Sequence, residues 1–248
     1  MPIPARIFQT AKVAIPEETR AQLRAMLDDE CEYEFFDDAD AAAFLRSNPL
    51  EDFPDAENLF VNVIPVGAHK ADFFRYYYIY VRGGVFIDSD AMLYMPLRSI
   101  LARGYDFFSI NSIYNKTVFQ GFIGADSGNR IVYGALKNMY ETFVRTNASN
   151  FKNINYYYFT HVLYQLVNDP NWTNGYHLHM FREAGKTADG KAAPTFDTVT
   201  GRTMLVHYFK DKSVPPNLDD ETMRTLAPQA LYSAPPRLRS KKINMMFT

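Results

Sequence analysis

The chain has 248 residues, of which 47% are hydrophobic and 15% aromatic, and its formal net charge at pH 7 is −2. A chain of this length and composition is expected to fold into a globular protein with a substantial core rather than to remain disordered. The small net charge gives no general electrostatic attraction to nucleic acid, so we expect no nucleic-acid partner.

The sequence also indicates a cellular compartment. Its single cysteine, Cys31, excludes an intrachain disulfide and is typical of a reducing environment. No apolar run reaches the roughly 20 residues that span a bilayer, and residues 1–10 do not have the form of a signal peptide. We therefore expect a soluble, cytoplasmic protein.

The start of the chain alternates predicted strands with predicted helices. Residues 5–12 and 33–36 read as strands, while 17–27 and 37–47 read as helices. Both helices begin with acidic residues, which are favourable near the positive end of a helix dipole. This alternation is typical of an α/β fold with parallel strands.

An aromatic helix is predicted next, over residues 70–82, because aromatic side chains recur there at three-to-four spacing. Gly83 and Gly84 end it, since glycine readily adopts the positive φ of a helix C-terminus. Residues 85–87 then read as a short buried strand. The helix and the strand thus flank a tight turn.

The second half of the chain continues the mixed pattern. Residues 104–111 and 119–125 read as strands, 131–144 as an amphipathic helix and 203–209 as a late strand. The stretch 184–201 is rich in Gly, Lys, Thr and Ala, which predicts a mobile loop.

Two carboxylates, Asp88 and Asp90, follow the strand at 85–87 directly. In an open α/β sheet, ligands bind beyond the carboxyl ends of the strands, and side chains two residues apart on a strand face the same side. Both carboxylates can therefore converge on one position, where two hard oxygen ligands suit Mg²⁺ or Mn²⁺. An isolated D-x-D is more often a solvated turn, so the context of the motif decides its meaning.

The preceding helix supplies that context. Asp72 and Arg75 are three residues apart and share a helix face. Arg75 offers a forked donor and Asp72 an acceptor, a pair suited to gripping the vicinal hydroxyls of a sugar. The alternative is a surface ion pair worth less than about 1 kcal/mol.

Residues 71–90, ADFFRYYYIYVRGGVFIDSD, resemble the D-x-x-R-(x)7-G-G-x-Y/F-x-D-x-D signature of a sugar-binding region that contains a DXD motif. That region belongs to glycosyltransferase family 32, which includes yeast outer-chain mannosyltransferases and bacterial capsular and polysaccharide enzymes; the clostridial glucosylating toxins carry a related version. The positions at family spacing are Asp72, Arg75, Gly83, Gly84, Phe86, Asp88 and Asp90.

Three further segments resemble the same family. Residues 3–12 are similar to its opening I-P-K-x-I-H-Q-T-W, residues 119–136 to its acceptor-side strand and helix, and residues 204–213 to its closing V-H-x-x-x-G-S-W. Phe8 stands where the family usually has histidine, and Phe86 where it more often has tyrosine. The resemblance extends over most of the chain to about Ser213.

The resemblance implies a GT-A fold, a single Rossmann-like α/β domain with a central mixed sheet. This domain would span residues 1–214, followed by an irregular, proline-rich and basic tail over 215–248. The implied reaction transfers a hexose with retention from a nucleoside-diphosphate sugar, UDP- or GDP-linked. The acceptor would be a hydroxyl of a glycan, a lipid-linked molecule or a protein.

The resemblance also implies roles for individual residues. Asp88 and Asp90 would bind Mn²⁺ or Mg²⁺ with the donor diphosphate, and His207 would complete the metal side. Asp72, Arg75, Asp88 and Asp90 form the implied catalytic set. The implied donor-binding set is Phe8, Gln9 and Thr10 at the base, Asp72 and Arg75 at the sugar, and Gly84, Asp88, Ser89, Lys210, Lys212 and Ser213 around the phosphates.

Retention requires no protein nucleophile if the acceptor attacks on the face that the diphosphate leaves, and no unassigned carboxylate stands out as a nucleophile. We therefore favour front-face substitution.

Two other functions stay open at the level of sequence. VFIDSDAML also resembles the strand and D-x-D of haloacid-dehalogenase-like phosphatases, in which Asp88 would be the nucleophile, although that motif leaves Asp72 and Arg75 unexplained. A non-catalytic nucleotide-sugar- or glycan-binding protein could keep the same residues. Separately, the segment over residues 235–248 contains four basic residues followed by apolar ones, and it could make weak peripheral contact with an anionic membrane.

Overall fold

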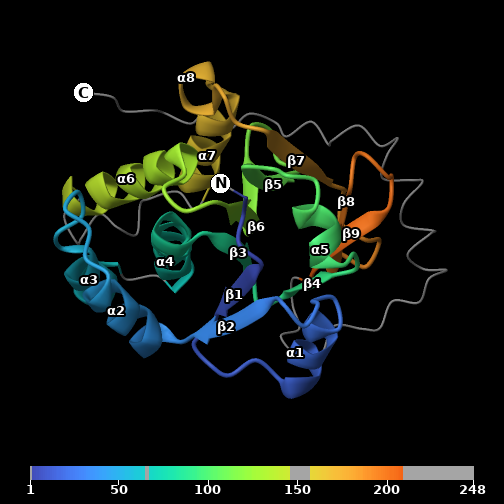
Figure 1. The fold of residues 1–248 in the computed structure, drawn as a ribbon, viewed down its shortest axis with the longest axis horizontal. Helices are drawn as coiled ribbons and strands as arrows, with labels where there is room; N and C mark the ends of the chain where they lie inside the picture. The colour runs from blue at the N-terminus through green and yellow to red at the C-terminus, as the bar shows by residue number, and fades with distance from the viewer. Residues whose placement is uncertain (1, 65–66, 146–156, 209–248) are drawn as a thin grey trace.

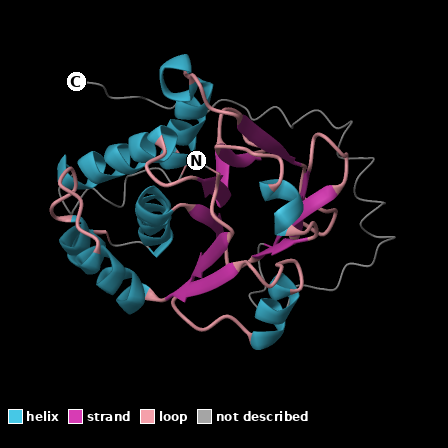
Figure 2. Ribbon diagram, viewed as in Figure 1, coloured by secondary structure: helices cyan, strands magenta, loops and turns pink. Residues whose placement is uncertain are grey.

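The computed structural model describes residues 2–64, 67–145 and 157–208. A nine-stranded sheet runs through the centre of the molecule, with helices on both of its faces (Figures 1 and 2). The strand order is β2-β1-β3-β6-β5-β7-β8-β9-β4. The strands are β1 (Arg6–Thr10), β2 (Glu32–Phe36), β3 (Gly84–Ile87), β4 (Ala91–Leu93), β5 (Phe107–Asn111), β6 (Val118–Ala125), β7 (Leu178–Glu183), β8 (Ala192–Phe196) and β9 (Thr203–Tyr208).

The helices divide between the two faces of the sheet, with α2, α4, α6 and α7 on one face and α1 and α5 on the other. No described helix is both long enough and apolar enough to span a bilayer. The helices are α1 (Glu17–Arg24), α2 (Asp38–Ser47), α3 (Ala56–Asn58), the π-helix η1 (Leu59–Val63), α4 (Gly67–Arg82), α5 (Leu97–Leu101), α6 (Arg130–Arg145), α7 (Tyr158–Asn168) and α8 (Pro170–Thr173).

The opening of the chain follows the predicted α/β rhythm. Strand β1 pairs in parallel with β2 on one side and with β3 on the other, whereas β3 pairs antiparallel with β6. The prediction of an α/β fold with a central mixed sheet is therefore confirmed.

Side chains of the central strands alternate between two hydrophobic clusters, one on each face of the sheet. Ile7, Val85 and Ile87 point into the cluster on the side of α1 and α5, while Phe8 and Phe86 point into the cluster beneath α4. This alternation is the two-residue period of a strand that is buried on both faces. Because the side chains of β3 alternate in this way, the next residue on the side of Phe86 is Asp88, which therefore approaches the face beneath α4.

The central part of helix α4, residues 72–79, is buried, and the aromatic helix predicted over 70–82 is confirmed. Its tyrosines pack inside and direct their hydroxyls to fixed partners: Tyr77 donates to the carbonyl of Asn48 at 2.7 Å and Tyr76 to the side-chain oxygen of Gln120 at 2.5 Å. Gly83 ends the helix with a φ of +67° and donates its N–H to the carbonyl of Ile79 at 2.8 Å.

One expectation for the second half is wrong. The predicted loop over 184–201 contains β8, whose five residues are all buried and which lies between β7 and β9. Pro194 and the Gly- and Lys-rich flanks suggested a loop, but Pro194 uses its carbonyl to accept from the N–H of Ala184 at 2.8 Å. The predicted strand at 203–209 is confirmed as β9.

Strand β4 was not predicted and has an unusual position. It follows β3 after only residues 88–90, yet it lies at the far end of the strand order, paired antiparallel with β9. The sheet must therefore curl until its last strand returns to the end of β3. Tyr94 and Tyr208 hydrogen-bond through their hydroxyls at 2.8 Å beside this pairing.

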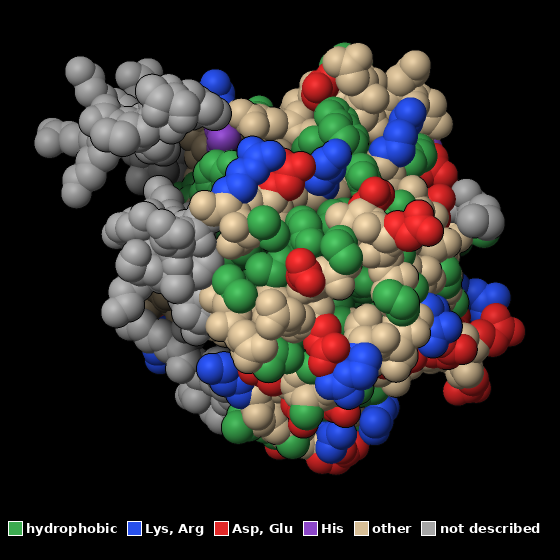
Figure 3. Space-filling model, turned by 90° about the vertical axis from the view of Figure 1, so that its left-hand side faces the viewer, with side chains coloured by type: hydrophobic (Ala, Val, Ile, Leu, Met, Phe, Trp, Pro, Cys, Tyr) green, Lys and Arg blue, Asp and Glu red, His purple; other side chains and the backbone are tan. Residues whose placement is uncertain are grey.

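The described residues on one face of the molecule show no concentration of one charge (Figure 3). On the face that carries α2, α3 and α6, acidic and basic side chains are interspersed with hydrophobic ones (Figure 3). This agrees with the formal net charge of −2. The predicted tail over 215–248, with its proposed membrane contact, lies outside the described residues.

A buried ion pair fastens the curled half of the sheet. Asp197, which follows β8 and is fully buried, accepts two hydrogen bonds from Arg103 at 2.8 and 2.7 Å. Thr200 donates to the same carboxylate at 2.6 Å. Burial raises the pKa of Asp197, but the hydrogen bonds from Arg103 and Thr200 outweigh burial and hold the pKa well below its usual value.

We expect Asp197→Asn to lower the free energy of unfolding at pH 7 by about 2–4 kcal/mol, because Arg103 loses its charged partner. Since the pKa of Asp197 is lower in the folded state than in the unfolded state, its contribution is complete above about pH 5 and is lost as the pH falls through the unfolded value near 3.9 and below. Urea unfolding of the two proteins between pH 3 and pH 7 measures this. A difference in stability that does not shrink at low pH would contradict the prediction.

We expect Gly84→Ala to destabilise the protein by about 2–4 kcal/mol, because Gly84 has a φ of +114° and an added Cβ would lie 2.9 Å from the carbonyl oxygen of Arg6. The matched control is Gly104→Ala, where φ is +69° and nothing lies within 4 Å of the added Cβ. Gly104→Ala should lower the free energy of unfolding by only about 1–2 kcal/mol, which is the cost of placing a residue with a side chain at a positive φ. Equal losses in urea unfolding would show that β1 does not constrain Gly84.

Candidate active site

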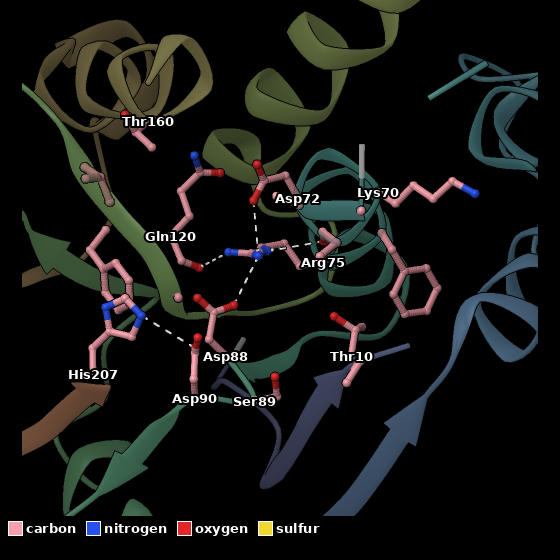
Figure 4. A pocket seen from close by; sticks show the side chains of 18 of the residues that line it. Thr10, Lys70, Asp72, Arg75, Asp88, Ser89, Asp90, Gln120, Thr160 and His207 are labelled. Carbon is pink, nitrogen blue, oxygen red and sulfur yellow. Dashed lines mark hydrogen bonds and ion pairs between the residues drawn. The ribbon is translucent and has the colours of Figure 1, made fainter. Parts of the chain in front are cut away.

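A cavity of about 580 Å³ opens where β1 and β3 end and β6 begins, near the N-terminal half of α4. Its wall contains Asp72 and Arg75 from α4 and Asp88, Ser89 and Asp90 from the turn after β3 (Figure 4). The structure thus brings the D-x-x-R pair and the D-x-D motif to one cavity.

The direction of Asp88 follows from the pleat of β3. Phe86 and Asp88 are two residues apart, so the carboxylate continues on the face beneath α4. The backbone N–H of Asp88 donates to the carbonyl of Gly121 on β6 at 2.8 Å. A Cβ at Gly121 would lie 2.4 Å from Oδ2 of Asp88, so a side chain at this position would displace the carboxylate.

Asp88 and Asp90 do converge, but not as consecutive inward residues of a strand. Strand β3 ends at Ile87, and residues 89 and 90 form a turn in which the N–H of Ala91 donates to the carbonyl of Asp88 at 3.0 Å. The two carboxylates were expected to converge because they share one face of a strand, and this explanation is wrong. The turn, and the pairing of the next strand, direct Asp90 to the cavity.

Arg75 is the most highly connected charged group of the site. Its Nη2 atom lies 3.1 Å from a carboxylate oxygen of Asp72 and 3.2 Å from one of Asp88, and its Nη1 atom donates a hydrogen bond to the carbonyl of Gln120 (Figure 4). The guanidinium lies over the ring of Phe86, 4.1 Å from its centroid. Arg75 is only 4% exposed, so the surface ion pair considered for Asp72 and Arg75 is excluded.

His207 reaches the motif through strand pairing. Ala91 on β4 lies opposite His207 on β9, and the Nε2 atom of His207 is 3.5 Å from Oδ1 of Asp90. Burial lowers the pKa of His207, but the hydrogen bond and charge of Asp90 outweigh burial, so the pKa is raised above its ordinary value. Burial raises the pKa of Asp88, and the charge of Arg75 opposes this rise.

These three residues form a plausible cation site. One ligand atom each from Asp88, Asp90 and His207 lies within 4.8 Å of the other two. Two carboxylate oxygens suit Mg²⁺ or Mn²⁺, and the imidazole nitrogen favours Mn²⁺ of the two because Mg²⁺ is the harder ion. The donor set therefore fits a divalent cation.

The other predicted residues divide into two groups. Thr10 and Ser89 line the cavity, whereas Phe8, Gln9 and Gly84 do not. Phe8 is fully buried and packs against Tyr78, with ring centroids 4.0 Å apart. The structure therefore does not bring the side chain of Phe8 to a base pocket.

Gln9 acts behind the cavity wall instead of in it. Its side-chain amide donates to the carbonyl of Asp88 at 3.2 Å, and its side-chain oxygen accepts from Tyr33 at 3.0 Å. Gln9 thus holds the turn in place. Lys210, Lys212 and Ser213 lie outside the described residues.

Sequence reasoning missed several residues of the cavity wall. The missed cations are Lys12, Lys70 and Lys186, and the missed polar and aromatic groups are Gln120, Tyr114, Tyr157 and Glu183. Lys12 and Gln120 fall within segments that resemble the family, which could have drawn attention to them. Glu183 belongs to no motif, and only the tertiary structure reveals it.

A family model described as "Glycosyltransferase sugar-binding region containing DXD motif" matches residues 13–107. The resemblance inferred from residues 71–90 is thereby confirmed over this region, which contains α4 and the turn after β3. The match supports a glycosyltransferase as the class of protein. None of the curated proteins matches the chain.

Two solved structures are similar to this chain. PaToxG Glycosyltransferase aligns with a TM-score of 0.46 and 14% identity over 70% of this chain and 73% of that chain. The glycosyltransferase GlyE of Streptococcus pneumoniae TIGR4 aligns with a TM-score of 0.43 and 8% identity over 72% of this chain and 45% of that chain. At these values neither likeness bears on substrate or mechanism.

We expect strong energetic coupling between Arg75 and Asp72, because each is the charged partner of the other inside the protein. A double-mutant cycle with Arg75→Met and Asp72→Asn, followed by urea unfolding, should give a coupling free energy of about 1–3 kcal/mol. The control is the pair of Arg6, which is partly buried, and Glu32, which is exposed; their oppositely charged atoms lie 2.6 Å apart.

The same cycle on Arg6→Met and Glu32→Gln should give less than about 1 kcal/mol, since water screens that pair. Equal coupling energies for the two pairs would mean that burial does not strengthen the interaction at the cavity.

Proposed function

We propose that the protein is a metal-dependent, retaining glycosyltransferase that transfers a hexose from a UDP- or GDP-sugar to an acceptor hydroxyl. The convergence of Asp88, Asp90 and His207 with the Asp72–Arg75 pair on one cavity supports this most directly. The cavity wall is thus provided with groups for both a diphosphate and a sugar.

In this proposal Asp88, Asp90 and His207 hold a divalent cation, Mn²⁺ or Mg²⁺. When bound, the cation supplies positive charge that stabilises the negative charge developing on the leaving diphosphate. Arg75 fixes the position of Asp88 through their contact at 3.2 Å. Gln9 supports the same turn from behind.

Asp72 is the proposed acceptor of hydrogen bonds from the donor sugar. Its carboxylate lines the cavity and is oriented by Arg75 at 3.1 Å. A carboxylate held in this way can bind hydroxyls without rearranging when the substrate enters, which reduces the cost of reaching the transition state. Thr10 and Lys12 line the part of the cavity next to β1, and we assign the nucleotide to that part.

The proposed transfer is a front-face substitution. The bond between the anomeric carbon and the diphosphate oxygen breaks, and its electron pair goes to the diphosphate. The acceptor oxygen forms the new bond to the same face of the anomeric carbon, and its proton passes to the diphosphate. Trapping of a glycosyl–enzyme adduct would contradict this mechanism.

The two alternatives make different predictions. A phosphatase that uses Asp88 would need that carboxylate to attack phosphorus, but Asp88 is held by Arg75 and no observation favours this role. A non-catalytic nucleotide-sugar-binding protein would bind the donor without turning it over. Release of the nucleoside diphosphate, and the anomeric configuration of the product by NMR, distinguish these from retaining transfer.

We expect a UDP- or GDP-sugar together with Mn²⁺ to raise the melting temperature by about 5–10 °C at a hundredfold excess over its Kd, because only the folded protein binds the complex. A thermal-shift panel of both nucleotide classes, with and without Mn²⁺, measures this. Asp90→Asn should abolish the metal-dependent part of the shift.

The matched control is Asp29→Asn, which makes the same change of charge at an exposed position outside the cavity. It should retain the full shift. If no donor gave a metal-dependent shift, or if both variants lost it equally, the proposed function would be wrong.

A further inference from the structure

A second polar cluster lies in the same cavity, away from the D-x-D turn in sequence. It is built by the end of β7, the connection between β5 and β6, and the residue before α7. Its members that line the cavity are Ser112, Ile113, Tyr114, Tyr157, Glu183 and Lys186.

Glu183 is the buried acid of this cluster, with 6% of its surface exposed. Its Oε2 atom accepts hydrogen bonds from the hydroxyl of Ser112 at 2.7 Å and the N–H of Ile113 at 3.1 Å. No hydrogen bond from another described residue reaches its Oε1 atom. Because Glu183 lines the cavity, this second oxygen can accept a hydrogen bond from the hydroxyl of a ligand there, and a hydrogen bond to a charged group is stronger than one between neutral groups.

Two aromatic side chains line the same cavity as this carboxylate. The ring centroids of Tyr114 and Tyr157 are 5.2 Å apart, and the ring planes are inclined by 54°. Tyr157 is 43% exposed, and it lines the same cavity as Glu183 and Lys186. The cluster therefore combines an aromatic surface with one carboxylate.

The loop that carries Tyr114 is held in a defined shape. Lys116 adopts a φ of +54°, which is uncommon for a residue with a side chain. Its carbonyl oxygen lies 2.9 Å from the Nδ1 atom of His161 on α7, a hydrogen-bonding distance. Contacts from α7 and from Glu183 thus fix both sides of the loop, so Tyr114 is presented by a positioned segment.

We propose that this cluster is the acceptor subsite and that the acceptor is a sugar. Glu183 accepts a hydrogen bond from a ring hydroxyl next to the one that attacks, while Tyr114 and Tyr157 pack against the C–H face of the ring. A sugar ring offers both features at once, a rim of hydroxyl donors and an apolar face. This inference rests on the proposed function, because it places the acceptor in the cavity of the donor.

The test compares transfer with donor hydrolysis. The donor that binds in the thermal-shift panel is incubated with Mn²⁺, with and without the methyl glycosides and disaccharides of glucose, galactose, mannose and N-acetylglucosamine. Release of the nucleoside diphosphate without a sugar reports hydrolysis, and the increase with a sugar reports transfer. We expect at least one of these sugars to accelerate release.

Glu183→Gln should raise the KM for that sugar and lower the ratio of transfer to hydrolysis about tenfold or more, as loss of a charged hydrogen bond implies. Its amide keeps one oxygen for Ser112 and Ile113, so the loop stays anchored. Ser112→Ala is the matched control, because it removes the anchoring hydrogen bond but leaves the carboxylate. If Glu183 served only to anchor the loop, the reverse result is expected: Ser112→Ala would impair transfer and Glu183→Gln would not.

The aromatic surface is tested separately at an exposed position, where loss of folding is not expected. Tyr157→Leu should raise the KM for the sugar, and Tyr157→Phe, which keeps the ring, should restore it. If the donor is hydrolysed but no sugar accelerates release, or if only a serine or tyrosine peptide does, the acceptor proposal is wrong while the proposed function stands. If no donor binds or is hydrolysed, the proposed function itself fails.

Discussion

Residues 88–90 connect a strand in the middle of the sheet to a strand at its end, and this short connection is the constraint on which the site depends. Because so few residues join β3 to β4, the far end of the sheet must return to the C-terminal end of β3. The pairing of β4 with β9 then places His207 beside Asp90. The candidate cation site therefore combines carboxylates from a turn with an imidazole from a distant strand.

A buried positive charge complements this backbone constraint. Arg75 lies beneath the surface, and a desolvated guanidinium requires charged or strongly polar partners. Asp72, Asp88 and the carbonyl of Gln120 meet that requirement. The same contacts restrict the carboxylates to defined positions, so Asp72 on α4 and Asp88 in the turn after β3 are coupled through one side chain.

Local patterns were sufficient for the part of the site that is contiguous in sequence. The spacing of Asp72, Arg75, Asp88 and Asp90 correctly placed a helix and a strand end at one cavity, although a turn rather than a strand directs Asp90. Phe8 could not be placed, because the face on which a strand residue lies depends on pairing with its neighbours. Strand β8 was missed because its burial comes from β7 and β9, and Glu183 has no motif to mark it.

The curled sheet has a consequence for the order of folding. Tyr94 and Tyr208, whose hydroxyls meet at 2.8 Å beside the pairing of β4 and β9, are 114 positions apart in the chain. Closing so long a loop is entropically expensive and makes such contacts form late. During synthesis, β1, β2 and β3 are complete long before β9 emerges from the ribosome. The nascent chain therefore carries the D-x-D turn without the histidine of the candidate cation site while residues 91–206 are being added.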